Sequence, residues 1–211
     1  MVSELVIGDP TWPYTKAKTA VLIAAAAAIR EDGPRAATLK NIASRAGITE
    51  PAIFRHFEGI DGLFNGLFTM VERMYDRFSA CYPEDAVGLA RFRAAMLGSI
   101  GVFADSKDFA YVIMHAEQVF RGYPDLKRRL DELKRRDEAK ALAALEEARE
   151  RREIRRDVEI DSIATAVIGM LHMTIVFWLD SGFAFDLREA GAKRWSDAER
   201  LMEMPPPCTD N

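Results

Sequence analysis

The stretch TLKNIASRAGITEPAIFRHF, residues 38–57, predicts two short helices joined by a tight turn. Thr38 offers a hydroxyl that can cap the first helix, and Leu39 and Ile42 then fall on one helical face. Gly47 supplies the backbone freedom that a sharp corner needs. Two short helices around a glycine turn form a helix-turn-helix, whose second helix can lie in the major groove of DNA.

The second helix is expected to begin at Thr49, which can cap it, and to run to His56. Pro51 falls in its first turn, where a missing backbone N–H costs nothing. Apolar side chains are expected on its buried face, at Ile53, Phe54 and Phe57. The outward face then carries the side chains available to a partner, namely Thr49, Glu50, Ala52, Arg55 and His56.

The residues before this motif make its interpretation more specific. Residues 21–33, VLIAAAAAIREDG, predict a helix that ends on glycine, and TL..IA..AGI and F-x-H-F follow in that order. Over residues 15–68 this combination resembles the amino-terminal domain of the TetR family of bacterial transcriptional regulators. The alternative is a generic three-helix bundle without a nucleic-acid role, which would not require all these spacings to agree.

The resemblance implies an all-α fold of about nine helices, with a regulatory and dimerisation domain behind a three-helix DNA-binding domain. We expect a flexible arm over residues 1–14, the helix-turn-helix domain over 15–62, and a helical ligand-binding and dimerisation domain over 63–211. Apolar residues at helical spacing predict further helices in the last part. After the helix that begins near Asp61, these cover residues 86–104, 108–120, 125–151, 162–179 and 187–203.

Composition limits the function classes. A chain of 211 residues with 49% hydrophobic residues can bury a full core, and its net charge of −4 excludes a globally basic nucleic-acid coat. Residues 35–56 nevertheless hold four Lys or Arg against Glu50 alone, which suits DNA binding confined to one domain.

The two cysteines, Cys81 and Cys208, show no disulfide or zinc spacing, and the first residues do not form a signal peptide. We therefore expect a cytoplasmic protein.

The predicted DNA contacts follow from position. Backbone N–H groups at the two helix starts can bind phosphate. Among the base contacts, Arg55 suits guanine, Glu50 suits cytosine and Ala52 suits a thymine methyl group. Phe54 stands where the family usually has tyrosine, and Ile60 where it commonly has lysine, so two backbone anchors are absent. The complete predicted set is Thr38, Lys40, Arg45, Thr49, Glu50, Pro51, Ala52, Phe54, Arg55 and His56.

No catalytic constellation is present in the sequence. The three histidines fall on separate predicted helices, and no glycine-rich phosphate loop or G-x-S-x-G appears. We expect neither an enzyme nor a bound metal or cofactor. The carboxy-terminal part is better interpreted as a sensor for a small apolar effector, although such residues are more often plain core. Its candidate ligand-binding residues are Met96, Ile100, Phe103, Phe109, Met114, His115, Phe120, Tyr123 and His172.

Residues 162–179, SIATAVIGMLHMTIVFWL, contain no Asp, Glu, Lys or Arg and are long enough to span a bilayer. A helix that is apolar all round can instead be buried between a core and a partner subunit. The resemblance favours the second interpretation, because it implies that the last two helices pair with their symmetry mates as a four-helix bundle. We therefore predict a homodimer and no membrane insertion.

The sequence thus predicts a dimeric, ligand-responsive repressor that binds a near-palindromic DNA operator. A helical interaction protein that kept the fold and lost strong DNA binding is the alternative, motivated by Phe54 and Ile60.

Overall fold

A computed structural model describes residues 12–202, with the side chain of Asp108 left undescribed. Within this range the chain forms ten α-helices and one short 3₁₀-helix, and no strand. The predicted all-α fold is therefore confirmed. By packing, the chain divides into two units: the first holds the residues up to Tyr75 together with Asp105–Leu133, and the second holds Asp76–Ala104 with the residues from Lys134 onward.

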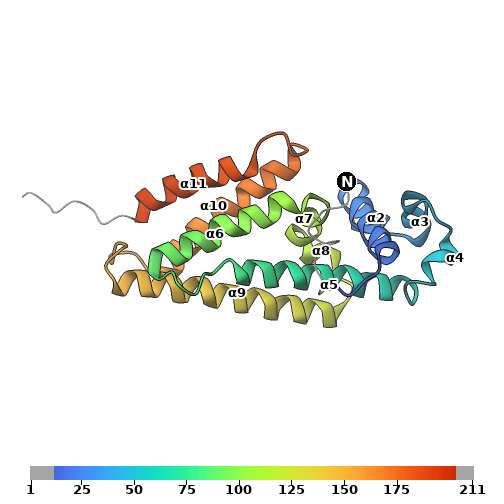
Figure 1. Cartoon of the computed structure of the whole chain (residues 1–211), viewed down its shortest axis with the longest axis horizontal. Coiled ribbons are helices and arrows are strands. Elements are labelled where there is room, and N and C mark those ends of the chain that lie inside the picture. The colour runs from blue at the N-terminus through green and yellow to red at the C-terminus, as the bar shows by residue number, and fades with distance from the viewer. Residues whose placement is uncertain (1–11, 203–211) are drawn as a thin grey trace, which may run out of the picture. The chain divides into compact units, whose positions relative to one another are not determined.

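The first unit contains the predicted DNA-binding motif. Its helix α2 packs against α3 and α7 (Figure 1). Leu22, Ile29, Ile42, Ile53 and Phe68 are completely buried in its core. The elements that lie entirely in this unit are α2 (Lys16–Asp32), η1 (Pro34–Ala36), α3 (Leu39–Ala46), α4 (Glu50–Ile53), α7 (Lys107–Met114) and α8 (Ala116–Val119).

The second unit contains the last two helices, which pack against each other. Phe92 and Trp195 meet edge to face in its core, with their ring centroids 5.7 Å apart. Two long helices supply residues to both units, α5 (Gly59–Ala80) and α9 (Pro124–Glu150). The other elements of this unit are α6 (Gly88–Asp105), α10 (Ile160–Asp180) and α11 (Leu187–Met202).

The helix ends follow the sequence signals in most places. Helix α2 ends at Gly33, which has a positive φ of 85°, as its glycine predicted, but it begins at Lys16, capped by the Thr15 hydroxyl. The single helix predicted over residues 108–120 is wrong. The chain breaks at His115 (φ −111°, ψ 20°), and this break separates α7 from α8.

The end of the predicted arm is packed against the first unit. The Trp12 indole donates to the Thr19 hydroxyl at 2.7 Å, and the Tyr14 hydroxyl donates to Thr69 at 3.1 Å. Residues 12–14 are therefore not a free tether. The rest of the predicted arm lies outside the described residues.

Helix α10 is the one helix among residues 12–202 that is long and apolar enough to cross a membrane, with a mean hydropathy of 1.8 over its best window. It is a half-buried protein helix here. Ile163, Val167, Leu171 and Trp178 face inward, while polar side chains such as His172 share its exposed face with apolar ones.

Candidate nucleic-acid interface

Helix α3 begins and ends as the sequence predicts. The Thr38 hydroxyl accepts a hydrogen bond from the Asn41 amide at 3.3 Å, which caps the first turn. The helix ends at Gly47, whose left-handed backbone (φ 68°, ψ 29°) would strain most other residues. The Ile48 amide then donates to the Ala43 carbonyl at 3.0 Å and closes the turn toward α4. These contacts hold the corner of the helix-turn-helix in place.

The second helix of the motif is shorter than predicted. Helix α4 ends at Ile53, and the Thr49 side chain makes no capping hydrogen bond. The chain continues as a tighter turn, in which the Arg55 amide donates to the Ala52 carbonyl at 3.2 Å and the His56 amide to the Ile53 carbonyl at 2.8 Å. These two bonds span three residues, and a third, from the Phe57 amide to the Ile53 carbonyl at 2.9 Å, spans four as in an α-helix.

The burial of the aromatic rings in this segment differs from the prediction. Ile53 is 0% exposed and Phe57 is 4% exposed, as predicted, but Phe54 is 56% exposed. The prediction that Phe54 faces the core is therefore wrong. Ile53 and Phe57 suffice to anchor the segment, and Phe54 is left on the surface beside Arg55.

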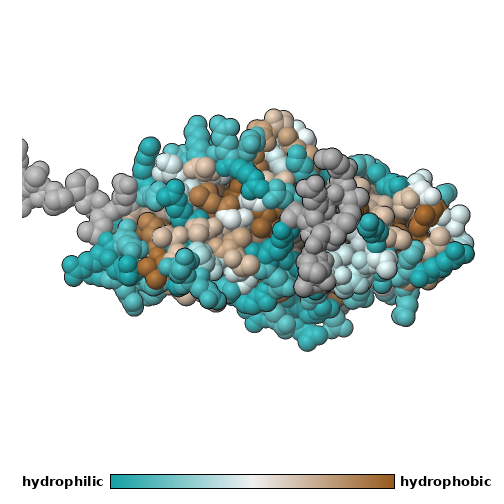
Figure 2. Space-filling view, in the orientation of Figure 1, coloured by the Kyte–Doolittle hydropathy of each residue, from teal (hydrophilic) through white to brown (hydrophobic). Residues whose placement is uncertain are grey.

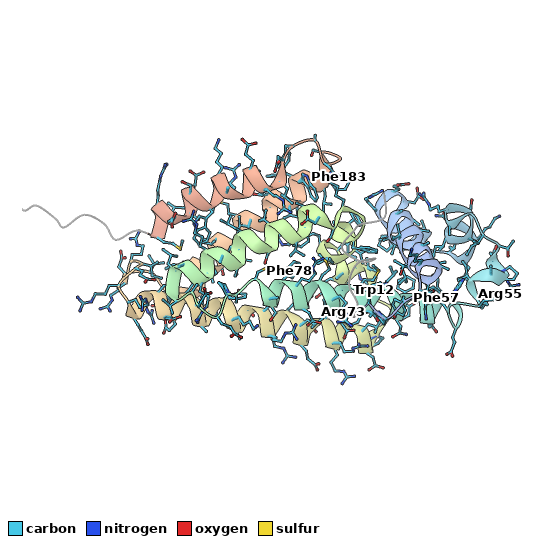
Figure 3. The ribbon with its side chains drawn as sticks, in the orientation of Figure 1. Trp12, Arg55, Phe57, Arg73, Phe78 and Phe183 are labelled. Carbon is cyan, nitrogen blue, oxygen red and sulfur yellow. The ribbon has the colours of Figure 1, made fainter. Side chains whose placement is uncertain are left out.

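The other predicted DNA-contact residues lie at the surface or close to it. Figure 3 shows Arg55 beside α4, on the side that points away from α2. Ala52 and His56 are half-buried. The exposed members of the set are Thr38, Lys40, Arg45, Thr49, Glu50, Pro51, Phe54 and Arg55.

Arg45 is already paired within the unit. Its Nη1 lies 2.5 Å from Glu31 Oε2 and its Nη2 lies 2.7 Å from Asp32 Oδ2. The hydrogen bonds from Arg45 hold the pKa of both carboxyls below their usual values, and the two carboxylates raise the pKa of Arg45. The local positive charge that the sequence suggests for residues 35–56 is therefore partly neutralised by the end of α2.

Sequence reasoning missed an aromatic and cationic cluster beside the motif. The Lys18 ammonium lies 4.6 Å from the centroid of the Tyr14 ring and 4.8 Å from that of Phe57. Phe57 belongs to the helix-turn-helix, whereas Tyr14 precedes α2, so this contact ties the entry of the unit to its DNA-binding motif. The two aromatic residues just before α2, Trp12 and Tyr14, were the available signal.

The nine predicted ligand-binding residues fall in two different units. Met96, Ile100 and Phe103 are buried in the second unit, where the Phe103 ring stacks on Phe78 at 5.1 Å between centroids. His172, in the same unit, is exposed and lines a groove of about 310 Å³ between α9 and α10.

The remaining candidates lie in the first unit. Phe109 and Phe120 are buried, and Met114 is half-buried. The Tyr123 ring stacks on Phe64 at 4.7 Å, and His115 stacks on Tyr111 at 4.0 Å. Phe109 and Phe120 belong to the core of this unit and Tyr123 packs against it, so the role of these five residues toward an effector stays a prediction. Nowhere in residues 12–202 do three or more His, Cys, Asp or Glu side chains gather as a metal ion would require.

Comparison with known proteins shows what the chain is similar to. Residues 21–67 match the sequence model of the tetR family of bacterial regulatory proteins. This segment covers most of α2, all of α3 and α4, and the first turns of α5, which is the part of the chain that carries the helix-turn-helix.

Solved structures of this class share the fold. The ketosteroid transcriptional regulator KstR2 of Mycobacterium tuberculosis aligns with a TM-score of 0.79 at 18% identity, covering 90% of this chain and 96% of its own. The fatty acid degradation regulator FadR of Bacillus halodurans aligns with a TM-score of 0.68 at 16% identity, covering 88% and 96%. FadR of Bacillus subtilis, solved with stearoyl-CoA, aligns with a TM-score of 0.63 at 16% identity, covering 85% and 96%.

The amino-terminal part of the chain therefore matches the tetR family of bacterial regulatory proteins, and the chain as a whole shares the fold of solved transcriptional regulators.

Proposed function

We propose that the chain is a cytoplasmic transcriptional repressor that binds a near-palindromic operator as a homodimer and releases it in response to a small apolar effector. The observation that carries this proposal is the surface of α4 and its following turn. Thr49, Glu50 and Arg55 are exposed on a segment that the buried Ile53 and Phe57 anchor. A polar face on an anchored helix-turn-helix is what reading of the major groove needs.

The proposed contacts divide into base contacts and phosphate contacts. Arg55 suits guanine O6 and N7, Glu50 suits the amino group of cytosine, and Ala52 suits a thymine methyl group. Thr38 and Lys40, near the first turn of α3, are proposed to contact phosphates together with backbone N–H groups there. In a dimer, two copies of this segment would enter successive major grooves about 34 Å apart.

We propose that α10 and α11 form the dimer interface. Several large apolar side chains of these helices and of the loop between them are exposed, and Phe177 is the most exposed of those on α10 at 58%. Figure 2 shows brown and tan atoms among hydrophilic ones over the part of the second unit that α6, α10 and α11 form. Burial of such a face in a two-fold interface fits the preference of soluble oligomers for closed symmetry. The exposed large apolar residues of α10, of α11 and of the loop between them are Ile168, Met173, Phe177, Phe185 and Leu201.

This effector is proposed to be a small molecule with an extended apolar part, of the acyl-thioester or steroid type. Two proteins of the same fold support this class, since one is described as a ketosteroid regulator and another was solved with stearoyl-CoA. The effector can act only through a difference in affinity for the DNA-competent and DNA-incompetent states. A coupling of about 1–3 kcal/mol would weaken operator binding about 5- to 150-fold. Native mass spectrometry of the purified protein, before and after organic extraction, tests whether such a molecule is carried.

A second function is supported by specific observations. Phe54 lacks the hydroxyl of the usual tyrosine, Ile60 lacks the charge of the usual lysine, and Arg45 is engaged by two carboxylates. All three features reduce the anchoring available on DNA. They support a helical interaction protein with weak DNA binding as the alternative.

Selection from randomised duplex DNA separates the two functions. The full-length protein is incubated at low salt with a duplex pool, and the retained fraction is sequenced over several rounds. The repressor proposal predicts enrichment of a motif with two-fold symmetry. A retained pool without such a motif would favour the interaction protein.

A further inference from the structure

Arg45, at the end of α3, uses all three nitrogen atoms of its guanidinium group within the first unit. Besides the contacts of Nη1 with Glu31 and of Nη2 with Asp32, its Nε donates to the Asn41 side-chain oxygen at 3.1 Å. These bonds use three of the five N–H groups of the guanidinium, and the two carboxylates offset its positive charge. The attraction of Arg45 for a DNA phosphate is thereby weakened.

Asn41 extends these contacts to the start of α3. Its side-chain amide donates to the Ala36 carbonyl at 3.0 Å and to Asp32 Oδ2 at 3.3 Å. Its backbone amide donates to the Thr38 cap. The Arg45 network, which we define as Arg45, Asn41, Glu31 and Asp32, thus joins the first and last turns of α3 to the end of α2 and to η1.

We propose that Arg45 is a positioning residue, which sets the angle of α3 and of the following Gly47 turn against α2, and that it does not contact DNA phosphate. This inference rests on the proposed DNA-binding function and replaces the phosphate contact that the sequence predicts for Arg45. A single exposed ion pair contributes little to stability. A planar guanidinium that binds two carboxylates and an amide oxygen also fixes the relative orientation of the helices that carry these groups. Helix α3 has only eight residues, of which Ile42 and Ala43 are buried, so polar contacts at its two ends can add to the packing that sets its orientation.

Substitutions at Arg45 and at its partners distinguish positioning from phosphate contact. The measurements are operator affinity at several salt concentrations, with the full-length protein and the selected operator. Arg45→Gln should weaken binding about three- to tenfold, the loss expected from two exposed ion pairs, with an unchanged slope of log K against log [salt]. Lys40→Gln is the matched control on the same helix, and its slope should fall by about 1 per subunit.

Removal of the two carboxylates should change operator affinity in opposite directions for the two roles of Arg45. If Arg45 positions α3, Glu31→Gln with Asp32→Asn should weaken operator binding to a similar extent as Arg45→Gln. If Arg45 contacts phosphate, the same double substitution frees its charge and should tighten binding. Arg45→Lys separates the two roles a second time, because a lysine keeps the positive charge for a phosphate but loses the planar geometry of the guanidinium. If Arg45 positions α3, we expect the Arg45→Lys protein to bind the operator as weakly as Arg45→Gln.

Hydrogen exchange gives a readout that needs no DNA. The amides of α3 should exchange faster in Arg45→Gln than in the wild type, while those of α10 should be unchanged. Faster exchange in α3 together with an unchanged salt slope supports the inference. A reduced slope, tighter binding of the carboxylate double variant, or unchanged exchange in α3 would overturn it. If no operator is enriched, the function proposal fails, and the exchange measurement still decides whether Arg45 holds α3.

Discussion

Gly66 on α5 lies so close to Phe57 that a Cβ atom at this position would be 2.8 Å from the ring carbon Cε1. The same Cβ would be 2.8 Å from Leu22 Cδ2 on α2. The absence of a side chain at residue 66 therefore allows α5 to approach both α2 and the end of the helix-turn-helix. This close approach positions Phe57, which anchors the segment that carries Arg55.

Gly66→Ala should destabilise the protein by about 1–3 kcal/mol, because Leu22 and Phe57 are buried and must shift to admit the methyl group. Gly62→Ala on the same helix is the matched control, since its Cβ would meet no atom closer than 3.5 Å. The control should be neutral or stabilising by up to about 1 kcal/mol, through its higher helix propensity. Urea unfolding of both variants checks the difference, and equal free energies would contradict the packing described here.

Phe54→Tyr should tighten operator binding without a change in stability. The ring is 56% exposed, so the added hydroxyl remains in solvent in the free protein. One hydrogen bond to phosphate contributes about 0.5–1.5 kcal/mol, or about two- to tenfold in affinity. Phe57→Tyr is the control, because it places the same hydroxyl at a ring that is 4% exposed and should cost stability instead. An unchanged operator affinity for Phe54→Tyr would show that residue 54 lies away from the DNA backbone.

Arg55→Ala should reduce discrimination at one position of each half-site by about 1–3 kcal/mol. The reason is the loss of a bidentate contact with guanine, which other bases cannot replace. Repeating the selection with the variant and comparing the two motifs position by position is the measurement. A uniform loss of affinity over all operator variants would instead assign Arg55 to phosphate.

Phe177→Asp should convert the dimer to a monomer. A charge at this exposed position of α10 costs the folded monomer little, but a partner subunit would bury it, which costs about 2 kcal/mol or more at the centre of an interface. Val87→Asp is the control, because Val87 is also an exposed apolar residue and precedes α6, outside α10 and α11. Light scattering at micromolar concentration checks both. A wild-type monomer would refute the proposed dimer itself.

Asp137→Asn should raise the free energy of unfolding at neutral pH. Burial raises the pKa of Asp137, although Lys140 and Arg136 oppose the shift, and its Oδ1 has no hydrogen-bond partner among the described residues. A raised pKa means that the folded state holds the proton more tightly than the unfolded state. The contribution of Asp137 to stability is therefore present below the unfolded pKa and is lost as the pH rises through the folded pKa.

Urea unfolding of wild type and Asp137→Asn at acidic and at neutral pH measures this difference. We expect the gap between the two proteins to widen in favour of the variant as the pH rises. Asp125→Asn, on the exposed first turn of α9, is the control and should change the free energy of unfolding by less than about 0.5 kcal/mol. A gap that does not change with pH would contradict the proposed shift.

The sequence signals that proved correct are local ones. The Thr38 cap, the helix end at Gly33 and the left-handed Gly47 each depend on the backbone chemistry of one or two residues. Such preferences act in almost any surroundings, and they sufficed to predict the fold class and the place of the helix-turn-helix. The family resemblance added the order of the two functional parts.

The features that sequence reasoning got wrong depend on geometry that periodicity does not carry. Phe54 was assigned to the same apolar side as Ile53 and Phe57, but the turn after Ile53 leaves its ring 56% exposed. The break at His115 lacks a proline or glycine signal. The partners of Arg45 lie 13 and 14 residues away on another helix, and no pattern in the sequence connects them to it.

The measurement that tests the central claim most directly is a titration of the selected operator with the full-length protein, followed by fluorescence anisotropy. The same duplex with one half-site scrambled serves as the comparison. Two-fold reading by two recognition segments predicts saturation at two chains per intact duplex and a loss of affinity of at least about tenfold on scrambling. Equal affinity for the intact and scrambled duplexes would contradict the account of this chain as an operator-binding dimer.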